Sequence, residues 1–279
     1  MNNFKTVIRP KTGWRDINLK ELWQYRDLIF LYVKRNFTLR YKQTILGPAW
    51  LIISPLLNTI ISNIVFGKIA EIPSDGVPYF IFFMCGNTAW TYFAYCLNNT
   101  SVTFIKNASV FGKVYFPRLV APVSTVITGL GEFAVNLGMF AAFWAYFKII
   151  GAGITITWTL ALLPVLILQM AALGLGCGII ISSLTTKYRD LTVLVSFGVS
   201  LWMYVTPVIY STTTLAPNIR ALCMLNPMAP IIEILRYSCL GTGDISWGYW
   251  GISLAVTAAI LLLGIIMFSK VEKTFNDTV

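Results

Sequence analysis

The sequence contains no histidine, the side chain whose charge changes most readily near neutral pH. General acid or base catalysis by histidine, histidine metal sites and haem ligation by histidine are therefore excluded. Charged residues are also few: Asp, Glu, Lys and Arg make up 11% of the 279 residues, against 57% hydrophobic residues, and the mean hydropathy is +0.72. This composition is typical of an integral membrane protein.

A glycine-rich phosphate-binding loop of the Walker type is absent as well. We therefore expect no catalytic residues and no ATP or magnesium site in this chain. Since no nucleic-acid-binding module is recognisable, the net charge of +10 indicates a basic cytoplasmic membrane face and not a DNA-binding surface. The five cysteines lack the paired spacing of a metal site. Cys223 and Cys239 either form a disulfide or remain free thiols, which is the commoner state.

Long intervals with little or no charge predict six membrane-spanning helices. A helix needs roughly 20 apolar residues to cross a bilayer. The intervals that meet this requirement place spans near residues 47 to 67, 78 to 103, 119 to 147, 157 to 183, 191 to 210 and 247 to 269. The expected fold is therefore all-α, with both termini on the same side of the membrane because the number of spans is even.

Lysine and arginine are unevenly distributed between the two sides that this topology defines. Ten lie before residue 47, three between 104 and 118, two at 187 and 189, and two at 270 and 273, so 17 of 21 lie on the side of the termini. Short cytoplasmic loops carry such an excess. We expect cytoplasmic termini in a multi-pass protein of the cytoplasmic (inner) membrane. No signal peptide is expected, because the charged N-terminal region precedes any long apolar run.

The segment from residue 18 to residue 42 has the pattern of an amphipathic helix. Its apolar residues at helical spacing are Leu22, Ile29, Val33 and Phe37, and most cations fall on other faces. Asn18 precedes Glu21 by three residues, which is the spacing of a capping box, so Asn18 is the expected N-cap. A helix of a soluble domain is the alternative, but the first span begins within one turn of this segment. We expect a helix on the membrane surface, in a cytoplasmic region of residues 1–46 that precedes a transmembrane domain of residues 47–279.

Three of the expected spans carry polar and aromatic residues about four positions apart, which places each set on one helix face. The sets are Trp50, Ser54, Asn58 and Ser62 in the first span, Asn87, Thr91, Tyr95 and Asn98 with neighbouring Trp90 in the second, and Ser196, Ser200, Tyr204 and Pro207 in the fifth. Lipid would leave such groups without hydrogen bonds, so they should face protein or a water-containing path. Hydrogen bonding between helices is the alternative for any one face. Because three faces coincide, we expect a substrate path lined by Trp50, Ser54, Asn58, Trp90, Tyr95, Asn98, Ser200 and Tyr204.

Two further features belong to single spans. Glu132 is the one acid at expected membrane depth, in the third span, and it is equally compatible with a functional carboxylate and with a structural one that is protonated or paired. The fourth span carries Gly174, Gly178 and Ser182 on one face, a pattern that lets helices approach closely. We expect this fourth span to be a packing helix.

The segment between the fifth and sixth spans is interrupted by prolines and contains an apolar piece too short to cross a bilayer. Asn226-Pro227 is a favourable helix start and Gly241 a favourable stop. Glu233 and Arg236 lie about one turn apart between them. We expect a re-entrant or interfacial helical hairpin on the outer side. A surface loop is the alternative, and the apolar residues around Glu233 disfavour it.

Two short connections lie on the side of the termini. The first has the pattern of a short amphipathic helix that ends before Pro117, with aromatic residues beside cations. Exposed aromatic residues of this kind form docking surfaces for partner proteins. A positively charged anchor at the membrane surface is the alternative for both connections. The candidate coupling residues are Phe111, Lys113, Tyr115, Phe116, Pro117 and Arg118 in the first connection and Tyr188, Arg189 and Asp190 in the second.

Short motifs follow one another along the chain in a specific order. They are Arg35-Asn36-Phe37 to Tyr41-Lys42, Leu46-Gly47-Pro48-Ala49-Trp50, Val114-Tyr115-Phe116-Pro117-Arg118, Tyr188-Arg189-Asp190, Pro207-Val208-Ile209-Tyr210, Asn226-Pro227, and the tail residues Phe268, Glu272, Phe275 and Asp277. With these motifs the chain resembles, over nearly its whole length, the membrane subunits of polysaccharide-exporting ABC transporters. These are the ABC type-2 permeases of the Wzm type, which handle O-antigen, capsule or teichoic acid.

This resemblance implies a homodimer of six-span subunits joined to two copies of a separate ATP-binding subunit, which would hold ATP and magnesium. The loop that ends at Arg118 would insert into that ATPase, and the turn at residues 188–190 would touch it. The substrate would be a long glycan on a polyprenyl pyrophosphate carrier, moved through a channel between the subunits. Sugar rings stack on Trp and Tyr through their apolar faces. Arg35, Arg40 and Lys42 would lie near the lipid headgroup or its pyrophosphate.

Other classes of protein stay open at this point. A related ABC exporter of a drug or small lipid would share the topology. An ion-coupled carrier or channel would need more intramembrane ionisable groups than Glu132 alone. A membrane-embedded transferase has the least support, because the chain offers neither histidine nor clustered carboxylates.

Overall fold

The computed structural model describes residues 19–42, 46–114, 116–185 and 190–278, and every regular element among them is a helix. The α-helices are α1 (Leu19–Gln24), α2 (Arg26–Tyr41), α3 (Trp50–Ser62), α4 (Tyr79–Ser101), α5 (Thr103–Phe111), α6 (Val120–Ile149), α7 (Leu163–Thr185), α8 (Leu191–Val205), α9 (Pro217–Met224), α10 (Met228–Leu240) and α11 (Trp247–Thr278). Short 3-10 helices η1 (Gly47–Ala49), η3 (Trp158–Leu162) and η4 (Thr212–Thr214) and the π-helix η2 (Asn63–Ile69) extend or join them. The expected all-α fold is confirmed.

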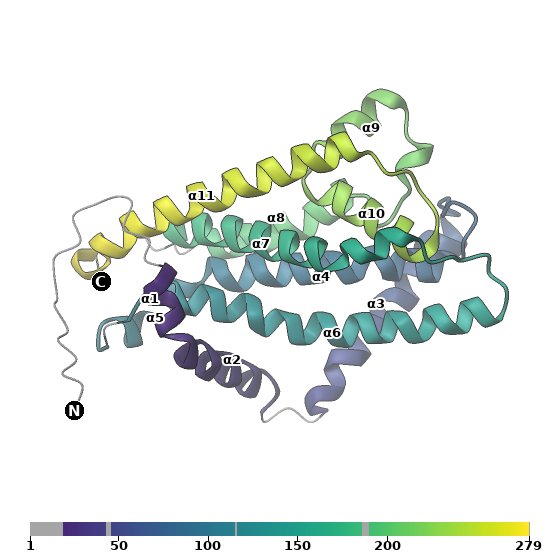
Figure 1. The fold of residues 1–279 in the computed structure, drawn as a ribbon. Coiled ribbons are helices and arrows are strands. Elements are labelled where there is room, and N and C mark those ends of the chain that lie inside the picture. The colour runs from purple at the N-terminus through teal and green to yellow at the C-terminus, as the bar shows by residue number, and fades with distance from the viewer. Residues whose placement is uncertain (1–18, 43–45, 115, 186–189, 279) are drawn as a thin grey trace.

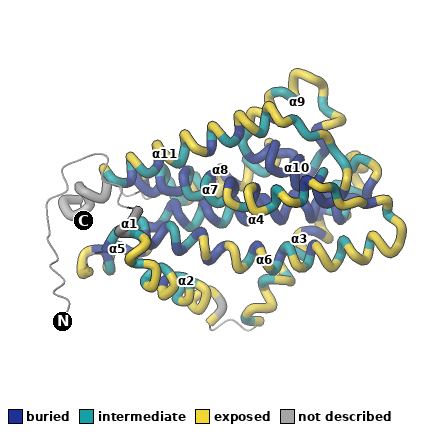
Figure 2. The backbone as a smooth tube through the Cα atoms, viewed as in Figure 1, coloured by how far each residue is buried: buried dark blue, intermediate teal, exposed yellow. Residues whose placement is uncertain are grey.

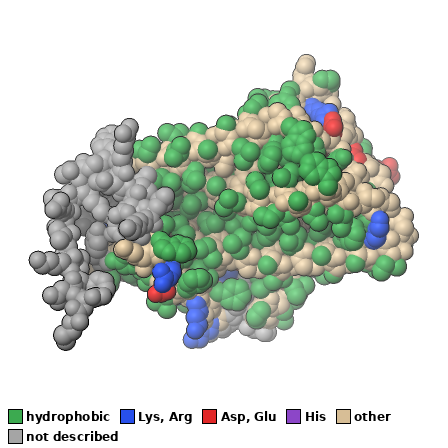
Figure 3. All heavy atoms as spheres, viewed as in Figure 1, with side chains coloured by type: hydrophobic (Ala, Val, Ile, Leu, Met, Phe, Trp, Pro, Cys, Tyr) green, Lys and Arg blue, Asp and Glu red, His purple; other side chains and the backbone are tan. Residues whose placement is uncertain are grey.

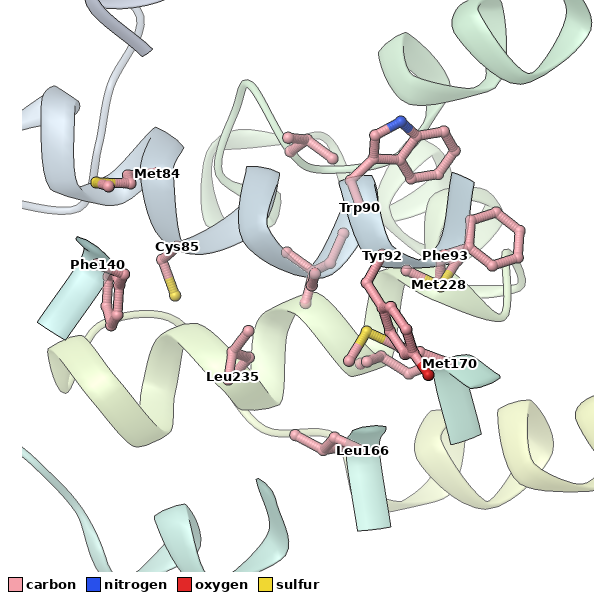
Figure 4. Close-up of a cluster of buried hydrophobic side chains, with 14 of the residues drawn as sticks. Met84, Cys85, Trp90, Tyr92, Phe93, Phe140, Leu166, Met170, Met228 and Leu235 are labelled. Atoms are coloured by element: carbon pink, nitrogen blue, oxygen red, sulfur yellow. The ribbon is translucent and has the colours of Figure 1, made fainter. Parts of the chain in front are cut away.

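Helix α4 lies at the centre of the bundle (Figure 1). It packs against α6, α7 and α10, and α7 in turn packs against α11. Figure 2 shows that buried residues dominate α4, whereas the helices around it carry exposed residues on their outer sides. Figure 4 shows the apolar core around α4, where Tyr92 and Phe93 of α4 lie with Met170 of α7 and Leu235 of α10. Burial of these large side chains stabilises the arrangement.

Among the described residues, four helical segments are long and apolar enough to cross a membrane. They cover Gly47–Ile69, Val120–Ile149, Trp158–Thr185 and Trp247–Lys270, and they agree closely with the first, third, fourth and sixth expected spans. Figure 3 shows a broad band of hydrophobic side chains on one face, with the charged side chains gathered toward its two ends. The chain is therefore an integral membrane protein.

The second and fifth expected spans are helices of a different character. α4 has 23 residues and no charge, but it carries asparagines such as Asn87, Asn98 and Asn99 and is too polar to qualify as a span by hydropathy. α8 is apolar but has only 15 residues, because the helix ends at Val205, two residues before Pro207. Six crossings thus remain a prediction from the charge pattern.

The small-residue face of α7 is the face on which α4 packs. A Cβ atom added at Gly174 would lie 2.6 Å from Cβ of Cys96, and one at Gly178 would lie 2.5 Å from Cβ of Thr100. Ser182 accepts a hydrogen bond from the backbone at the start of α5, at 3.5 Å. The two helices approach this closely because no side chain separates them. The expected packing role of this span is confirmed.

Replacement of Gly178 by alanine tests this packing. We expect Gly178→Ala to reduce the free energy of unfolding by about 1–3 kcal/mol, because the added methyl group overpacks the contact with Thr100. Gly138→Ala is the matched control, since no atom lies within 4 Å of a Cβ at Gly138 of α6. Thermal unfolding of both variants in detergent checks the prediction, and equal midpoints would contradict it.

The N-terminal segment forms two helices, α1 and α2, separated at Tyr25. The side chains that pack on the rest of the chain are Leu22, Tyr25, Leu28, Ile29 and Tyr32. Of the residues in the predicted apolar stripe, Leu22 and Ile29 pack on the rest of the chain, whereas Phe37 is exposed. The reason is that α2 packs along α6, and this contact selects its inner face. The predicted N-cap at residue 18 lies outside the described residues, and the position of α2 on a membrane surface stays a prediction.

The helix expected after Asn226-Pro227 is α10. Oδ1 of Asn226 accepts a hydrogen bond from the backbone N–H of Met228 at 3.1 Å, and Gly241 ends the helix with a φ of 73°. Both residue types suit these positions, because asparagine satisfies a free helical N–H and glycine adopts the left-handed conformation. α10 is buried against α4, α7 and α11, which rules out a surface loop. Whether α9 and α10 dip into the membrane from outside stays a prediction.

A buried ion pair holds α10 to its neighbours. Arg236 and Glu233 lie with N and O atoms 3.6 Å apart, and each side chain is 2% exposed. The guanidinium donates hydrogen bonds to the carbonyl oxygens of Val208 at 2.5 Å and Tyr210 at 3.2 Å. It also lies 3.7 Å from the centroid of the Phe82 ring in α4. Arg236 therefore fastens α10 both to α4 and to the segment that follows α8.

Removal of this guanidinium is expected to be costly. We expect Arg236→Met to reduce the free energy of unfolding by about 3–5 kcal/mol, because Glu233 would then be a buried charge without a partner. The control is Arg220→Met, since the pair of Arg220 with Asp244 at 3.0 Å is partly exposed and contributes at most about 1 kcal/mol. Unfolding in detergent compares the two, and a loss for Arg236→Met no larger than that of the control would show that the buried pair is unimportant.

The five cysteines are free thiols. Sγ of Cys223 lies 3.6 Å from the hydroxyl oxygen of Tyr210, whereas Cys239 lies beside Cys85 of α4. The choice between a Cys223–Cys239 bridge and free thiols is thus decided for free thiols, because the two side chains face different neighbours.

Candidate functional site

A cavity of about 550 Å³ lies between α2, α3, α4, α6 and α8. Its walls include all eight residues that three helix faces predicted: Trp50, Ser54 and Asn58 of α3, Trp90, Tyr95 and Asn98 of α4, and Ser200 and Tyr204 of α8. We name it the polar cavity. Ser62, Ser196 and Pro207, which lie at the ends of the predicted faces, are not part of its walls. The three helix faces therefore do meet, and they enclose a shared space.

Polar groups in this cavity are only partly satisfied by each other. Asn58 donates a hydrogen bond from Nδ2 to Oδ1 of Asn87 at 3.4 Å, from α3 to α4, and Ser200 bonds to a carbonyl oxygen of its own helix. Oδ1 of Asn98 and Oδ1 of Asn136 are buried and have no hydrogen-bond partner among the described residues. Unpaired acceptors are unfavourable away from water. The cavity is therefore suited to water or to a ligand that carries hydroxyl groups.

The polar cavity also contains one ion pair. Nη1 of Arg40, near the end of α2, contacts Oε1 of Glu132 in α6. The same guanidinium lies 5.0 Å from the centroid of the Tyr95 ring in α4. Of the alternatives for Glu132, the structure therefore has a paired carboxylate. This partner was not predicted, because α2 was expected on the membrane surface and not along α6.

A second cavity, of about 680 Å³, shares Arg40, Tyr95 and Asn99 with the first. Among the described residues, three cationic side chains line it, those of Arg35, Arg40 and Lys106, and no acidic side chain does. We name it the cationic cavity. The two cavities are therefore adjacent and share three wall residues: one has only cations among its charged side chains, and the other is polar and aromatic and contains the Arg40–Glu132 pair.

Two of the three cations donate hydrogen bonds to neutral side-chain amides. Arg35 donates a hydrogen bond from Nη2 to Oδ1 of Asn107 at 3.0 Å, and Lys106 donates from Nζ to Oδ1 of Asn99 at 3.4 Å. Burial, and then the positive charge of Arg40, lowers the pKa of Lys106. A neighbouring cation lowers a lysine pKa because two like charges repel each other. An anion placed in this cavity would relieve the repulsion.

The sequence found part of this site. Arg35 and Arg40 line the cationic cavity as expected for headgroup residues, whereas Lys42 is exposed and lines neither cavity. Sequence reasoning missed other wall residues, among them Asn99, Lys106, Asn107 and Asn136. Asn136 follows Glu132 by one helical turn, a spacing that indicates a shared face. The other three lie where α4 leads into α5, and no periodic pattern continues across that junction.

The expected docking connection contains the predicted short helix, α5, but its aromatic side chains face inward. Phe111 and Phe116 are 6% and 5% exposed, with ring centroids 5.6 Å apart. The ring of Tyr32 in α2 lies 5.9 Å from that of Phe116, and Arg118 is buried over Phe111. The expectation of exposed aromatics is wrong for Phe111 and Phe116, because α2 gives them an apolar partner within the chain.

The exposed part of this connection is short. Lys113 and Val114 are exposed, Pro117 is half-buried, and Asp190 is exposed at the start of α8. Three further candidate coupling residues, Tyr115, Tyr188 and Arg189, lie outside the described residues. A coupling role for either connection therefore stays a prediction, and among the described residues of the first one the exposed side chains include Ser109, Lys113 and Val114.

Comparison with known proteins bears directly on this site. The sequence profile of the ABC-2 type transporter family matches residues 27–240. The chain belongs to the ABC-2 type transporter family. The range that matches the family runs from α2 to the end of α10 and contains every wall residue of both cavities.

Individual relatives are similar over most of their length. Two O-antigen export system permease proteins RfbA from Klebsiella pneumoniae are 29% and 27% identical to this ABC-2 transporter protein over 252 and 251 residues, which cover 90% of this chain and 94% of each relative. The O-antigen export system permease protein RfbA from Myxococcus xanthus is 29% identical over 217 residues, 77% of this chain and 80% of the relative. The resemblance to polysaccharide-exporting ABC permeases is thereby confirmed.

The burial of Phe116 changes what its replacement tests. In this ABC-2 transporter protein we expect Phe116→Ala to reduce the free energy of unfolding by about 3–5 kcal/mol, because it leaves a cavity in the cluster of Tyr32, Phe104 and Phe111. Lys113→Glu, on the exposed tip, should change stability by less than about 0.5 kcal/mol. Thermal unfolding of the two purified variants measures the difference, and a Phe116→Ala protein as stable as Lys113→Glu would contradict the packing described above.

Proposed function

We propose that this protein is the transmembrane subunit of an ABC exporter that moves a lipid-linked polysaccharide across the cytoplasmic membrane, with ATP hydrolysed by a separate subunit. The observation that carries the proposal is that the cationic cavity and the polar cavity are adjacent and share the wall residues Arg40, Tyr95 and Asn99. A glycan attached to a diphosphate lipid has both an anionic part and a long uncharged part with hydroxyl groups. The two cavities are complementary to these two parts.

The side chains in each cavity suit their proposed ligand. Arg35, Arg40 and Lys106 supply charge for a phosphate, and the planar guanidinium groups match phosphate oxygens in pairs. In the polar cavity the aromatic residues offer flat apolar faces to sugar rings, and the asparagines offer hydrogen bonds to hydroxyl groups. The aromatic residues are Trp50, Trp90, Tyr95 and Tyr204. Stacking tolerates different sugars, so this site fits a repeating glycan of the O-antigen, capsule or teichoic-acid type.

A second copy of the chain would complete the path. Trp50 and Tyr204 line the polar cavity but are 44% and 59% exposed, and neighbouring apolar residues of α3 and α8, such as Ile61 and Phe197, are exposed as well. One chain thus supplies only part of a wall around a glycan. The proposed homodimer would place two such walls opposite each other and form a channel between the subunits.

The proposed topology keeps six crossings with both termini in the cytoplasm. Helix α4 need not be apolar to cross, because its polar residues are buried against other helices or line a cavity and do not meet lipid. α9 and α10 then form the outer hairpin, and the exposed tip at Lys113 and Val114 lies on the cytoplasmic side with Asp190. That side is where the ATP-binding subunit would dock.

Two other functions have weaker support. An exporter of a drug or small lipid would be expected to offer a mainly apolar pocket, whereas asparagines and serines line much of this one. An ion-coupled carrier would use Glu132 as a proton site, but Glu132 is paired with Arg40. The relatives from Klebsiella pneumoniae and Myxococcus xanthus are named as O-antigen export permeases, which favours the glycan.

Affinity purification from the native membrane tests the transporter class. We expect an ATPase to be recovered in equal amount with this subunit, and the complex to hydrolyse ATP. Mass spectrometry identifies the recovered proteins, and a phosphate-release assay measures hydrolysis. Recovery of the subunit alone, in a detergent that keeps other membrane complexes intact, would instead favour a channel or carrier.

Substitution of the stacking residues tests the glycan path. Each aromatic contact contributes about 0.5–1.5 kcal/mol beyond burial, so the double variant Trp50→Ala and Tyr204→Ala should lower glycan binding about tenfold. We expect surface glycan in cells to fall accordingly, as measured with a lectin or antibody. Trp158→Ala is the control, because Trp158 is exposed but lines neither cavity. Unchanged surface glycan in a double variant that is normally expressed would contradict the proposed path.

A further inference from the structure

Arg40 is the cationic residue that belongs to both cavities. Among the described residues that line them, Arg35 and Lys106 face only the cationic cavity, and Glu132 lines only the polar cavity. Arg40 bridges the two, with its guanidinium on the Tyr95 ring and against the Glu132 carboxylate. The ion pair therefore lies where the cationic cavity and the polar cavity adjoin.

The three cations differ in what holds them. Arg35 and Lys106 donate to amide oxygens, at 3.0 Å and 3.4 Å, so an arriving anion meets no competing charge at either. Nε of Arg35 is also buried, with no hydrogen-bond partner in the part of the chain that the structure describes. Arg40, by contrast, is already engaged by a carboxylate. An anion can recruit Arg40 only by displacing Glu132.

We infer that Glu132 is a built-in counter-ion, which holds Arg40 while the cationic cavity is empty and yields it to a phosphate-bearing group that enters that cavity. This inference rests on the proposed function, since it assigns a role to Glu132 within the same site. The ligand class is a phosphate or diphosphate, whether on a lipid or free. Glu132 thereby acts as a selectivity residue for anionic over neutral ligands.

The accessibility of the pair allows this exchange. The side chain of Arg40 is 45% exposed and that of Glu132 is 18% exposed, so both can move without disrupting the core. Tyr95 supports the guanidinium from one side in either position. Asn136 lies one turn beyond Glu132 on the same wall, and its amide can donate to the carboxylate once Arg40 has turned away.

The physical basis of the selectivity is the cost of a lone carboxylate. Taking Arg40 away removes the charge partner of the Glu132 carboxylate, whose side chain is 18% exposed, and this is unfavourable. A neutral lipid cannot pair with Arg40 and so cannot offset this cost. A diphosphate carries more negative charge than the carboxylate and accepts two parallel hydrogen bonds from a guanidinium group. Its binding to Arg40 can therefore offset the cost of separating Glu132 from Arg40. In the presence of a ligand without a phosphate, Arg40 and Glu132 would therefore remain paired.

Binding measurements on the purified complex of this chain with its ATPase test the inference. The probes are farnesyl pyrophosphate, farnesol of the same chain length, and inorganic pyrophosphate, each titrated by microscale thermophoresis. We expect Glu132→Gln to bind farnesyl pyrophosphate about tenfold more tightly than the unaltered protein, because the competitor for Arg40 is gone. Farnesol binding should be unaffected by the change.

A double-mutant cycle identifies Arg40 as the group through which Glu132 acts. Arg40→Gln should weaken farnesyl pyrophosphate binding about tenfold, and Glu132→Gln should then have no further effect in the Arg40→Gln protein. Asp244→Asn is the control for the loss of an acid elsewhere, since Asp244 lies in the exposed pair with Arg220. Should Glu132→Gln fail to fold, Glu132→Asp retains the charge with a shorter reach and should bind the probe severalfold more tightly.

The outcomes separate this inference from the proposed function. If Arg40→Gln weakens binding but Glu132→Gln leaves it unchanged or weaker, the counter-ion role is overturned and the cationic site stands. If neither Arg40→Gln nor Arg35→Gln affects binding, the proposed headgroup site fails as well. Inorganic pyrophosphate that binds as tightly as farnesyl pyrophosphate, with the same response to Glu132→Gln, would support the counter-ion role and identify free phosphate as the ligand.

Discussion

The structure depends on one constraint: a polar group inside an apolar membrane must find its hydrogen-bond or charge partner within the protein. Helix α4 carries many such groups, and it lies at the centre of the bundle. Gly174 and Gly178 of α7 allow this position, because they let the backbone of α4 come into direct contact. With its apolar side chains packed against α7 and α10, α4 can turn its remaining polar face toward α3 and α8. The polar cavity is the result.

The same constraint explains two ion pairs with different roles. Arg236 and Glu233 are almost completely buried and also engage backbone carbonyl groups, so this pair fastens the outer segment to the bundle. Arg40 and Glu132 are partly exposed and lie on the wall of a cavity. A fully buried pair can exchange partners only if the core opens. A pair beside a cavity can do so by side-chain rotation, which makes it the better candidate for a role in transport.

Much of the fold and of the site could be predicted, because the signals are local. Uncharged intervals located the helices, the four-residue spacing of Trp50, Ser54 and Asn58 identified a polar face, and Asn226 and Gly241 marked the ends of α10. The errors arose where packing between distant segments decides. Phe116 is buried because α2 folds against it, and nothing in the residues around Phe116 indicates that contact.

The sequence by itself therefore determined that the chain is a helical membrane protein, roughly where its long apolar helices lie, and which helix faces are polar. These properties follow from the turn of a single helix and from the cost of charge in lipid, both of which are local. Only the tertiary structure decided that three polar faces enclose one cavity, that α2 runs along α6, and that Arg40 meets Glu132. Helical periodicity states which residues share a face, but the partner of that face is selected by the packing of the whole bundle.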